Sequence, residues 1–324
     1  MPILSKLPST IRGVAVVMAL FVVALVSAVV LALLTYESID ITRTGWITQS
    51  YAAYFAAQGG TQAALEKLKM IEEKSPEGQA EIKWPLVVEA PPFKEGNVRV
   101  TVWDPLGRFN INNLQDPAMS AVFIRLMLLL DPNLNKEKAL EITQAIKKMF
   151  GLETNGNLSQ GASSKQGASL DQAKAVVKTP FREGVGLTSV SELRLVPGIS
   201  AERMMGLAPY VIALPLPTLI NVNTASALLL QSLSEEINSE DASLIVEQRQ
   251  GRPYEQIEDF LRRSSFAQKR LPMPLISVNS QYFLIEANVK LQEQTLLLLT
   301  LVMLEKTDPH HSKWNVLWQS QNTL

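Results

Sequence analysis

The chain opens with a long apolar run in place of the mixed pattern of a globular domain. Between Val14 and Leu34, 21 residues contain one polar side chain, Ser27. About 20 helical residues cross a bilayer core, so this run predicts a membrane-spanning helix. Lys6 and Arg12 precede it and favour a cytoplasmic N-terminus. A cleaved secretory signal is the alternative, but its apolar region has only about 7 to 15 residues and ends at a small-x-small site.

A helical pattern continues beyond this span. Larger apolar residues recur with a period near 3.6 residues at Ile47, Tyr51, Tyr54, Leu65 and Leu68. Ser75-Pro76 ends the pattern, because proline removes a helical hydrogen bond and restricts the residue before it. The sequence therefore predicts one helix over 14–74, about 90 Å long. Gly59-Gly60 within it indicates close packing or a kink.

Period-two alternation then predicts strands in two separate regions. Val98, Val100 and Val102 alternate with polar residues, and Asp104-Pro105-Leu106-Gly107 has the residues of a turn. Phe109 and Ile111 continue the alternation beyond that turn. Near the C-terminus, further alternation occurs at Phe283, Ile285, Ala287 and Val289, and at Trp314, Val316 and Trp318. Because consecutive strands usually share a sheet, 82–112 and 275–324 are expected to form one small sheet.

The region between the strand sets has helical patterns. The predicted helices are Pro117–Leu130, Asn135–Phe150, Ser189–Leu195 and Ser239–Gln250. Gly151 and Gly251 mark two helix ends, and Ser189 with Glu192 fits a capping box. Residues 152–169, rich in Gly, Ser, Asn and Gln, predict a flexible loop. The sequence thus indicates a helical insertion within one sheet domain.

The insertion carries a weak internal repeat. Phe109-Asn110-Ile111-Asn112 precedes its first half, and Ile220-Asn221-Val222-Asn223 opens the second. Asparagine side chains can cap a following helix, which we favour over a catalytic role. We therefore divide the insertion into a module at 113–218 and a module at 219–274.

Composition excludes several classes of site. The 324 residues include no cysteine, so neither a disulfide nor a thiolate metal site can form. His310 and His311 are the only histidines, and adjacent residues cannot supply a spaced ligand set. Glu153 and Asp171 are too sparse for a calcium loop, although acids from separate segments could still converge. We expect no enzyme activity, no cofactor and no metal.

A DNA-binding role is the main alternative function. Leu195–Ile199 joins two short segments like a helix-hairpin-helix motif, and 220–260 resembles repeats of competence-type DNA receptors. Such hairpins direct backbone N–H groups at phosphate, but Ser200 replaces one expected glycine. Residues 113–274 contain 17 Lys or Arg and 17 Asp or Glu, without the cation excess that DNA binding requires. The local basic cluster comprises Arg262, Arg263, Lys269 and Arg270.

Taken together, several motifs resemble the K family of minor pseudopilins of bacterial type II secretion. They are Arg12-Gly13 before the apolar helix, the Ala-rich stretch 52–65, and the segments 103–110, 187–199 and 220–225. The resemblance implies an α+β fold, in which a transmembrane helix packs on a pilin-like antiparallel sheet. It also implies an all-helical insertion of two helix-hairpin-helix or SAM-like modules. The expected divisions are a leader at 1–13, a span at 14–34, its periplasmic continuation at 35–74, the sheet segments and the two modules.

The resemblance also implies how the N-terminus is used. Prepilin peptidase would cut between Gly13 and Val14, and the new amine of Val14 would be methylated. Most related proteins begin with phenylalanine or methionine after cleavage, so Val14 departs from the pattern. Their fifth mature residue is usually glutamate, which pairs with the amine of an adjacent subunit, whereas this chain has Met18. A carboxylate in hydrocarbon is costly unless it is paired, so its absence suits a subunit at the filament tip.

The expected function is therefore non-catalytic. The protein would initiate and cap a periplasmic pseudopilus during export of folded proteins, anchored once in the inner membrane with its bulk in the periplasm. Its expected partners are minor pseudopilins I and J, other pseudopilus subunits and prepilin peptidase. The expected partner-helix contacts are Met18, Ile47, Tyr51, Tyr54, Leu65 and Leu68. The alternatives are that these residues form internal core, or that the chain is an anchored DNA receptor or a generic anchored periplasmic domain.

Overall fold

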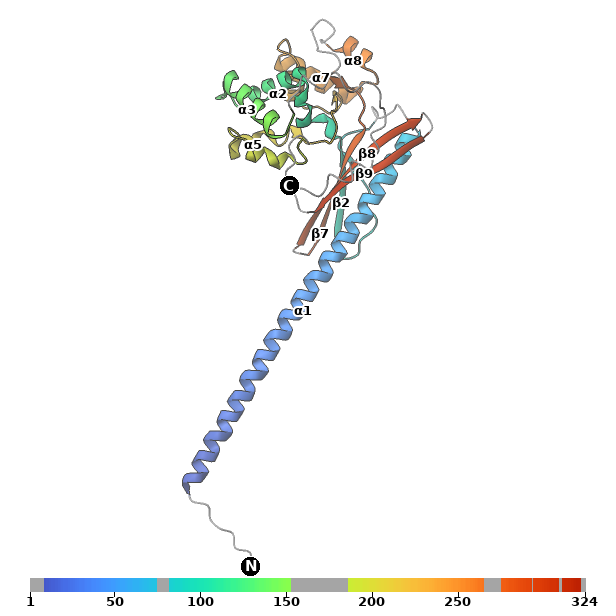
Figure 1. Ribbon diagram of the computed structural model, residues 1–324. Helices are drawn as coiled ribbons and strands as arrows, with labels where there is room; N and C mark the ends of the chain where they lie inside the picture. Colours follow the sequence, from blue (N-terminus) through green and yellow to red (C-terminus); the bar gives the residue numbers. More distant parts are fainter. Residues whose placement is uncertain are drawn as a thin grey trace, which may run out of the picture.

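A single long helix carries the rest of the protein at one end. The computed structural model describes residues 9–74, 82–152, 186–264, 275–292, 294–308 and 311–321. Helix α1, Ser9–Lys74, has 66 residues; its C-terminal part packs on a β-sheet, and its N-terminal part extends alone (Figure 1). The remaining helices gather beyond one end of the sheet (Figure 1). This arrangement confirms the α+β fold, with an N-terminal apolar helix and an antiparallel sheet.

The main sheet has five antiparallel strands in the order β1-β2-β7-β8-β9. Their bounds are Leu86–Val88, Asn97–Trp103, Tyr282–Leu291, Gln294–Asp308 and His311–Gln321. Val100 and Val102 of β2 are fully buried, as are Ile285, Ala287 and Val289 of β7. The predicted alternation is therefore confirmed in both of these strands, which are neighbours although more than 170 residues separate them.

Helix α1 meets the sheet through small side chains. Ala53, Ala57, Ala64 and Leu68 are at most 2% exposed and form one core with the inward residues of β2, β7 and β8. Because alanine side chains are small, the backbone of α1 can lie close to the backbone of the sheet. Gly60 continues this stripe, because a Cβ atom there would lie 2.6 Å from Val100 Cγ2. Within the glycine pair, Gly60 thus marks close packing, one of the two expected explanations.

The two adjacent glycines should respond oppositely to the same substitution. In Gly59→Ala the new Cβ meets nothing closer than 4.0 Å, so the variant should gain about 1 kcal/mol of helix propensity. In Gly60→Ala that gain is opposed by overpacking against Val100, which costs about 1 to 3 kcal/mol. Urea unfolding of the two variants measures the difference. Equal stability of both variants would contradict this account of the helix–sheet contact.

The insertion consists of short helices around one continuous core. Within its described residues the α-helices are α2 Pro117–Leu130, α3 Lys136–Met149, α5 Ala201–Leu207, α6 Ala227–Ser232, α7 Ser239–Gly251 and α8 Ile257–Arg263. The segment predicted at 189–195 is a 3-10 helix, η5 Val190–Leu195, with the expected capping box between Ser189 and Glu192. The buried side chains run from Phe109 to Val278 in one cluster, so both halves of the insertion share a core.

Two predictions about the edges of the insertion need correction. Phe109 and Ile111 do not extend the main sheet, because the 3-10 turn η2 Pro105–Gly107 directs the chain into the insertion. Phe109 begins β3, Phe109–Asn110, which pairs in parallel with β4, Val211–Ile212, and Ile111 begins the 3-10 helix η3, Ile111–Gln115. The insertion is therefore not all-helical. Most of the predicted loop at 152–169 lies outside the described residues.

The sequence repeat corresponds to a structural motif that occurs once in each half of the insertion: a short parallel strand pair and an asparagine amide bonded to distant backbone groups. In the second half, β5 Ile220–Asn221 pairs in parallel with β6 Ile276–Ser277, as β3 pairs with β4. Asn112 Nδ2 donates to the carbonyl oxygens of Leu187 and Leu214 at 2.9 and 2.8 Å. Asn223 Nδ2 likewise donates to Tyr254 and Val278 at 2.8 and 2.9 Å.

The expected capping role applies to only some of these asparagines. Asn110 caps η3 by accepting from the backbone N–H of Asn112 at 3.2 Å. Asn112 and Asn223 instead join chain segments that are distant in sequence. The buried amide of Asn112 and the half-buried amide of Asn223 therefore each hold one half of the insertion together.

Candidate interaction surfaces

The predicted cleavage site lies near the N-terminal end of α1, in an apolar part of the helix that no other described residue covers. Gly13 and Val14 belong to α1, and Val14 and Met18 are 61% and 65% exposed. Among the described residues one helix is long and apolar enough to cross a membrane, and its most apolar window is 0% buried. A single-pass anchor fits this geometry, because the exposed apolar side chains need a hydrocarbon or protein environment.

The other predicted partner contacts do not form one surface. Ile47 and Tyr51 are 47% and 62% exposed. Tyr54 and Leu65 are half-buried and pack against the core between α1 and the sheet. Leu68 is 2% exposed within that core, so its prediction as a partner contact is wrong for this structure. The alanine stripe turns Leu68 toward the sheet and leaves Tyr51 on the opposite side of the helix.

Sequence reasoning missed the most exposed aromatic residue on the sheet-covered part of the helix. Phe55 is 69% exposed and lies one turn beyond Tyr51 on the side away from the sheet. Its ring contacts that of Tyr54 edge-on, with centroids 5.9 Å apart. Ala53 and Ala57 could have indicated this position. If the small residues mark the face of the helix that packs on the sheet, the helical period places Phe55 on the opposite, exposed face. A period counted from the large residues, as in the prediction above, does not reveal this.

A buried polar cluster joins the sheet to the insertion. Asp104, at the end of β2, accepts hydrogen bonds from Leu106 N at 2.9 Å and from Asn221 Nδ2 and Thr224 Oγ1, both at 2.7 Å. Burial raises the pKa of Asp104, and hydrogen bonds from these groups and from Ser280 oppose the rise. Asp104 as a whole residue is only 8% exposed. The groups around Asp104 already donate hydrogen bonds to its carboxylate. The cluster is therefore suited to holding the insertion on the sheet rather than to proton transfer.

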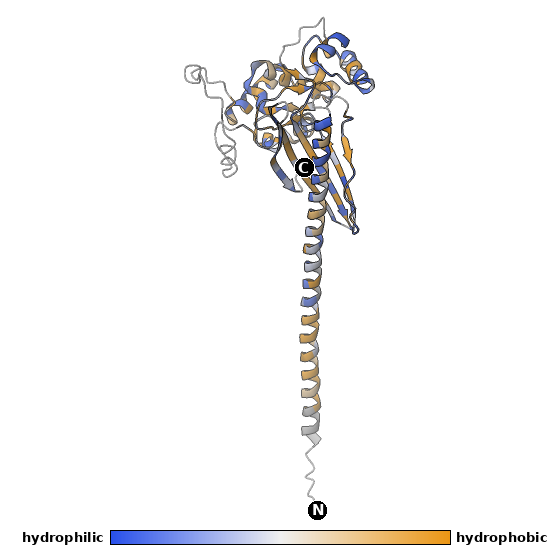
Figure 2. Ribbon diagram, turned by 90° about the vertical axis from the view of Figure 1, so that its right-hand side faces the viewer, coloured by the Kyte–Doolittle hydropathy of each residue, from blue (hydrophilic) through white to orange (hydrophobic). Residues whose placement is uncertain are grey.

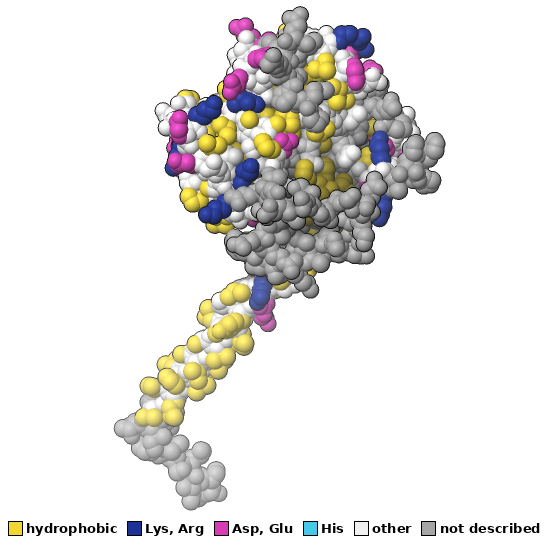
Figure 3. All heavy atoms as spheres, turned by 45° about the horizontal axis from the view of Figure 1, so that its top comes forward, with side chains coloured by type: hydrophobic (Ala, Val, Ile, Leu, Met, Phe, Trp, Pro, Cys, Tyr) yellow, Lys and Arg dark blue, Asp and Glu magenta, His cyan; other side chains and the backbone are white. Residues whose placement is uncertain are grey.

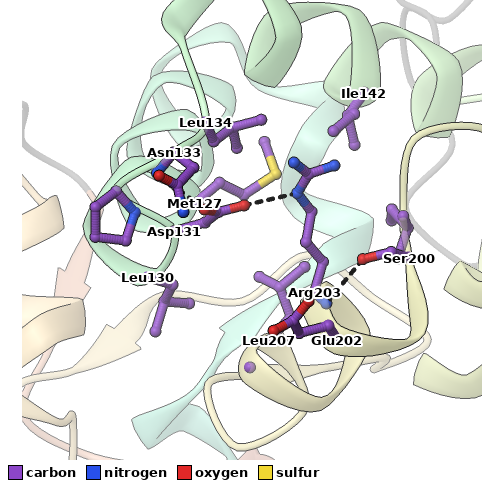
Figure 4. A pocket seen from close by; sticks show the side chains of 13 residues that line it. Met127, Leu130, Asp131, Asn133, Leu134, Ile142, Ser200, Glu202, Arg203 and Leu207 are labelled. Carbon is purple, nitrogen blue, oxygen red and sulfur yellow. Dashed lines mark hydrogen bonds and ion pairs between the residues drawn. The ribbon is translucent and has the colours of Figure 1, made fainter.

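The insertion also has a shallow cavity between α2, α3 and α5, with a volume of about 390 Å³ (Figure 4). Arg203 Nε lies 2.8 Å from Asp131 Oδ2, and Arg203 Nη1 donates to Gly198 O at 2.7 Å. The hydrogen bond from Arg203 lowers the pKa of Asp131. The floor is apolar and includes Met127, Leu134 and Ile142. Paired charges above an apolar floor indicate a structural ion pair and not a reactive centre.

The features expected of a DNA site serve packing instead. Gly198 has φ +91°, and a Cβ atom there would lie 2.9 Å from Ile142 Cγ1, so the hairpin faces α3. Arg262 and Arg263 pair with Asp259 at 3.1 and 2.9 Å, and Arg263 also lies over the ring of Tyr254. The other two members of the predicted basic cluster lie outside the described residues.

The charged surface of the insertion is mixed. Seen from above, cationic and anionic side chains are interspersed on it, with no area of one sign on the part of this face that is described (Figure 3). Within the described ranges no three His, Cys, Asp or Glu residues are grouped so that they could hold a metal ion. The described part of this face therefore lacks the cation excess that a nucleic-acid interface requires.

Comparisons with known proteins agree on one family. Two family models described as type II secretion system protein K match residues 107–216 and 220–279, together more than half of the chain. A protein of that name from Pseudomonas aeruginosa is 27% identical over 301 residues, covering 89% of this chain and 87% of the relative. Another from Klebsiella pneumoniae is 24% identical over 311 residues, covering 88% and 92%.

A solved structure has a similar fold. The crystal structure of the GspK-GspI-GspJ complex from the enterotoxigenic Escherichia coli type 2 secretion system contains a chain that matches with a TM-score of 0.63 and 22% identity. The match covers 87% of this chain and all of that chain. Fold, family models and relatives thus lead to one assignment: the chain belongs to the type II secretion system protein K family.

Proposed function

We propose that this chain, a minor pseudopilin of the type II secretion system, occupies the tip of the periplasmic pseudopilus, where it initiates and caps assembly. The observation that carries the proposal is an uncovered apolar helix with Met18 at the place where a carboxylate is usual. An ionised carboxylate in hydrocarbon requires a partner. A tip subunit has no earlier subunit to supply that partner, and methionine removes the requirement.

The insertion supports the same position. It is joined to the sheet through Asp104 and lies beyond one end of it, so it would obstruct a further subunit stacking there (Figure 1). In this proposal the two helix-hairpin-helix or SAM-like modules act as a cap and not as DNA-binding elements. The competence-type alternative is not favoured, because Gly198 and Arg263 are engaged inside the insertion.

The proposed partners are minor pseudopilins I and J, other pseudopilus subunits and prepilin peptidase. The name of the similar crystal structure, a GspK-GspI-GspJ complex, supports the first two. The protein would be anchored in the inner membrane with a cytoplasmic N-terminus and a periplasmic globular part. The proposed activity is mechanical assembly without catalysis.

Leader removal tests this proposal directly. Gly13→Leu should block cleavage before Val14, because pilin-type peptidases need a small, flexible residue beside the bond. Glycine also weakens the helix locally by about 1 kcal/mol relative to alanine, which favours opening at that point. The uncut chain should remain in the membrane and fail to restore secretion in cells that lack the protein. Intact mass and N-terminal sequencing measure cleavage.

Gly45→Leu is the matched control, because Gly45 also lies in α1 and a Cβ atom there meets nothing within 4 Å. This variant should be cut normally and should support secretion. Normal processing of Gly13→Leu at Val14 would refute the proposed maturation. A wild-type chain that keeps its first 13 residues beside an active peptidase would favour a generic membrane anchor.

A further inference from the structure

The cavity between α2, α3 and α5 has an apolar floor and an open wall (Figure 4). Its volume of about 390 Å³ is near the lower end of the range typical of ligand pockets. Met127, Ile142 and Leu207 in the floor are each at most 3% exposed, so only a narrow apolar surface faces the cavity. Gly206 belongs to the wall, and a Cβ atom there would meet nothing within 4 Å. The cavity therefore has room for one side chain from outside.

The rim of the cavity carries an excess of negative charge. Its charged side chains are Asp131, Glu202 and Arg203, two carboxylates against one guanidinium. Arg203 is already engaged, because its Nε lies 2.8 Å from Asp131 Oδ2. Lys138, which lies beside the hairpin before α5, is paired with Glu141 at 2.7 Å. Glu202 is exposed, and its carboxylate has no hydrogen bond or ion pair with another residue that the structure describes.

Two further groups on the rim define what could bind there. Helix α2 ends at Leu130 on the rim, with Asp131 as its C-cap. The C-terminus of a helix carries partial negative charge, because its last carbonyl groups have no helical partner. The side chain of Asn133 makes no hydrogen bond to another described residue, and an amide can both donate to and accept from a peptide backbone. The rim is therefore suited to a cation on a peptide.

We propose that this cavity binds a segment of a partner protein in which a large aliphatic side chain is next to a lysine or arginine. The aliphatic side chain contacts the floor at Met127 and Leu207, and the cation lies beside Glu202. Opposite charges across an interface select the partner and fix its orientation. The inference goes beyond the proposed function and does not depend on the position of the chain in a filament.

The location of the cavity favours a protein over a lipid as its occupant. Helices α2, α3 and α5 lie at the end of the molecule opposite the N-terminus of α1 (Figure 1). Hydrophobic residues predominate along the lower part of α1, whereas they are mixed with hydrophilic residues in the insertion (Figure 2). A lipid surface would require a broad apolar face, and the charged rim around this narrow floor does not provide one.

Disulfide tethering of the full chain in detergent tests the inference, and the natural chain has no cysteine to interfere. Gly206→Cys places a thiol on the cavity wall. Gly251→Cys is the matched control, because Gly251 also lies in a helix of the insertion and a Cβ atom there meets nothing within 4 Å. The probes are disulfides of the cysteamine amides of acetyl-Leu-Arg, acetyl-Leu-Glu and acetyl-Gly-Arg. Each is equilibrated with 2-mercaptoethanol, and intact mass gives the fraction of protein joined to the probe.

At Gly206→Cys the Leu-Arg probe should be favoured about fivefold over each of the other two, and at Gly251→Cys the three should agree within about twofold. Adding Glu202→Gln to Gly206→Cys should remove most of the preference for Leu-Arg over Leu-Glu. Equal capture of Leu-Arg and Leu-Glu would overturn the assigned charge, and equal capture of Leu-Arg and Gly-Arg would overturn the aliphatic contact. The same preference at Gly251→Cys would overturn the site. Pro132→Cys, on the exposed rim, repeats the measurement if Gly206→Cys does not fold.

Discussion

Asn112→Ala should lower the free energy of unfolding by about 3 to 5 kcal/mol, since leaving each buried polar group unsatisfied costs about 1 to 3 kcal/mol. The amide is 4% exposed and bonds three backbone groups: Leu187 O, Leu214 O and Leu187 N, the last at 2.8 Å. Water cannot replace these bonds without opening the core. Asn223→Ala should have a similar effect in the second half, where Tyr254 N and O and Val278 O depend on that amide.

Urea unfolding followed by tryptophan fluorescence measures both losses. Asn133→Ala is the matched control, because Asn133 is exposed and its side chain makes no hydrogen bond to another described residue. It should change stability by less than about 0.5 kcal/mol, as surface substitutions usually do. A loss below about 1 kcal/mol for Asn112→Ala would show that the amide does not close the first half of the insertion.

Gly107→Ala should destabilise the junction between sheet and insertion by about 3 kcal/mol, at the upper end of typical overpacking costs. A Cβ atom at this position would lie 2.7 Å from Thr224 O and 2.9 Å from Thr224 Oγ1. The backbone of Thr224 would have to move, and its hydroxyl would leave Asp104, which it contacts at 2.7 Å. The substitution therefore disturbs a buried carboxylate as well as creating a steric clash.

Gly206→Ala provides the comparison, because a Cβ atom there meets nothing within 4 Å and the residue lies inside α5. This variant should gain about 1 kcal/mol from helix propensity. Thermal and urea unfolding of both proteins give the difference. Comparable stabilities would mean that Thr224 adjusts freely and that the junction is not closely packed at Gly107.

Much of the local structure followed from the sequence because local physics decides it. The bounds of α2 match the prediction, and the capping box of Ser189 with Glu192 formed as expected. Asp116 and Pro117 start α2 by well-known end preferences, which depend on a few neighbouring residues. The alternation in β2 and β7 likewise reports burial on one face, which side-chain order along the strand determines.

The assignment of sites was less complete, because helical spacing gives the relative direction of side chains but not which direction the sheet covers. Tyr51 and Leu68 both fit an apolar period, yet one is 62% exposed and the other 2%. Phe55 was overlooked for the same reason. The deciding quantity is how closely two backbones approach, and here small residues such as Ala57 and Gly60 permit the closest approach.

The apolar helix, the strand alternation, the helix ends and the absence of cysteine chemistry could all be predicted, since each depends on composition or on neighbours along the chain. Three features could not be predicted in this way: Phe109 leaves the main sheet, Asn112 and Asn223 hold the two halves of the insertion together, and Gly107 lies against Thr224. These features depend on contacts between residues about 30 to 120 positions apart. Their energies arise when distant segments bury one another's polar groups, which no local pattern specifies.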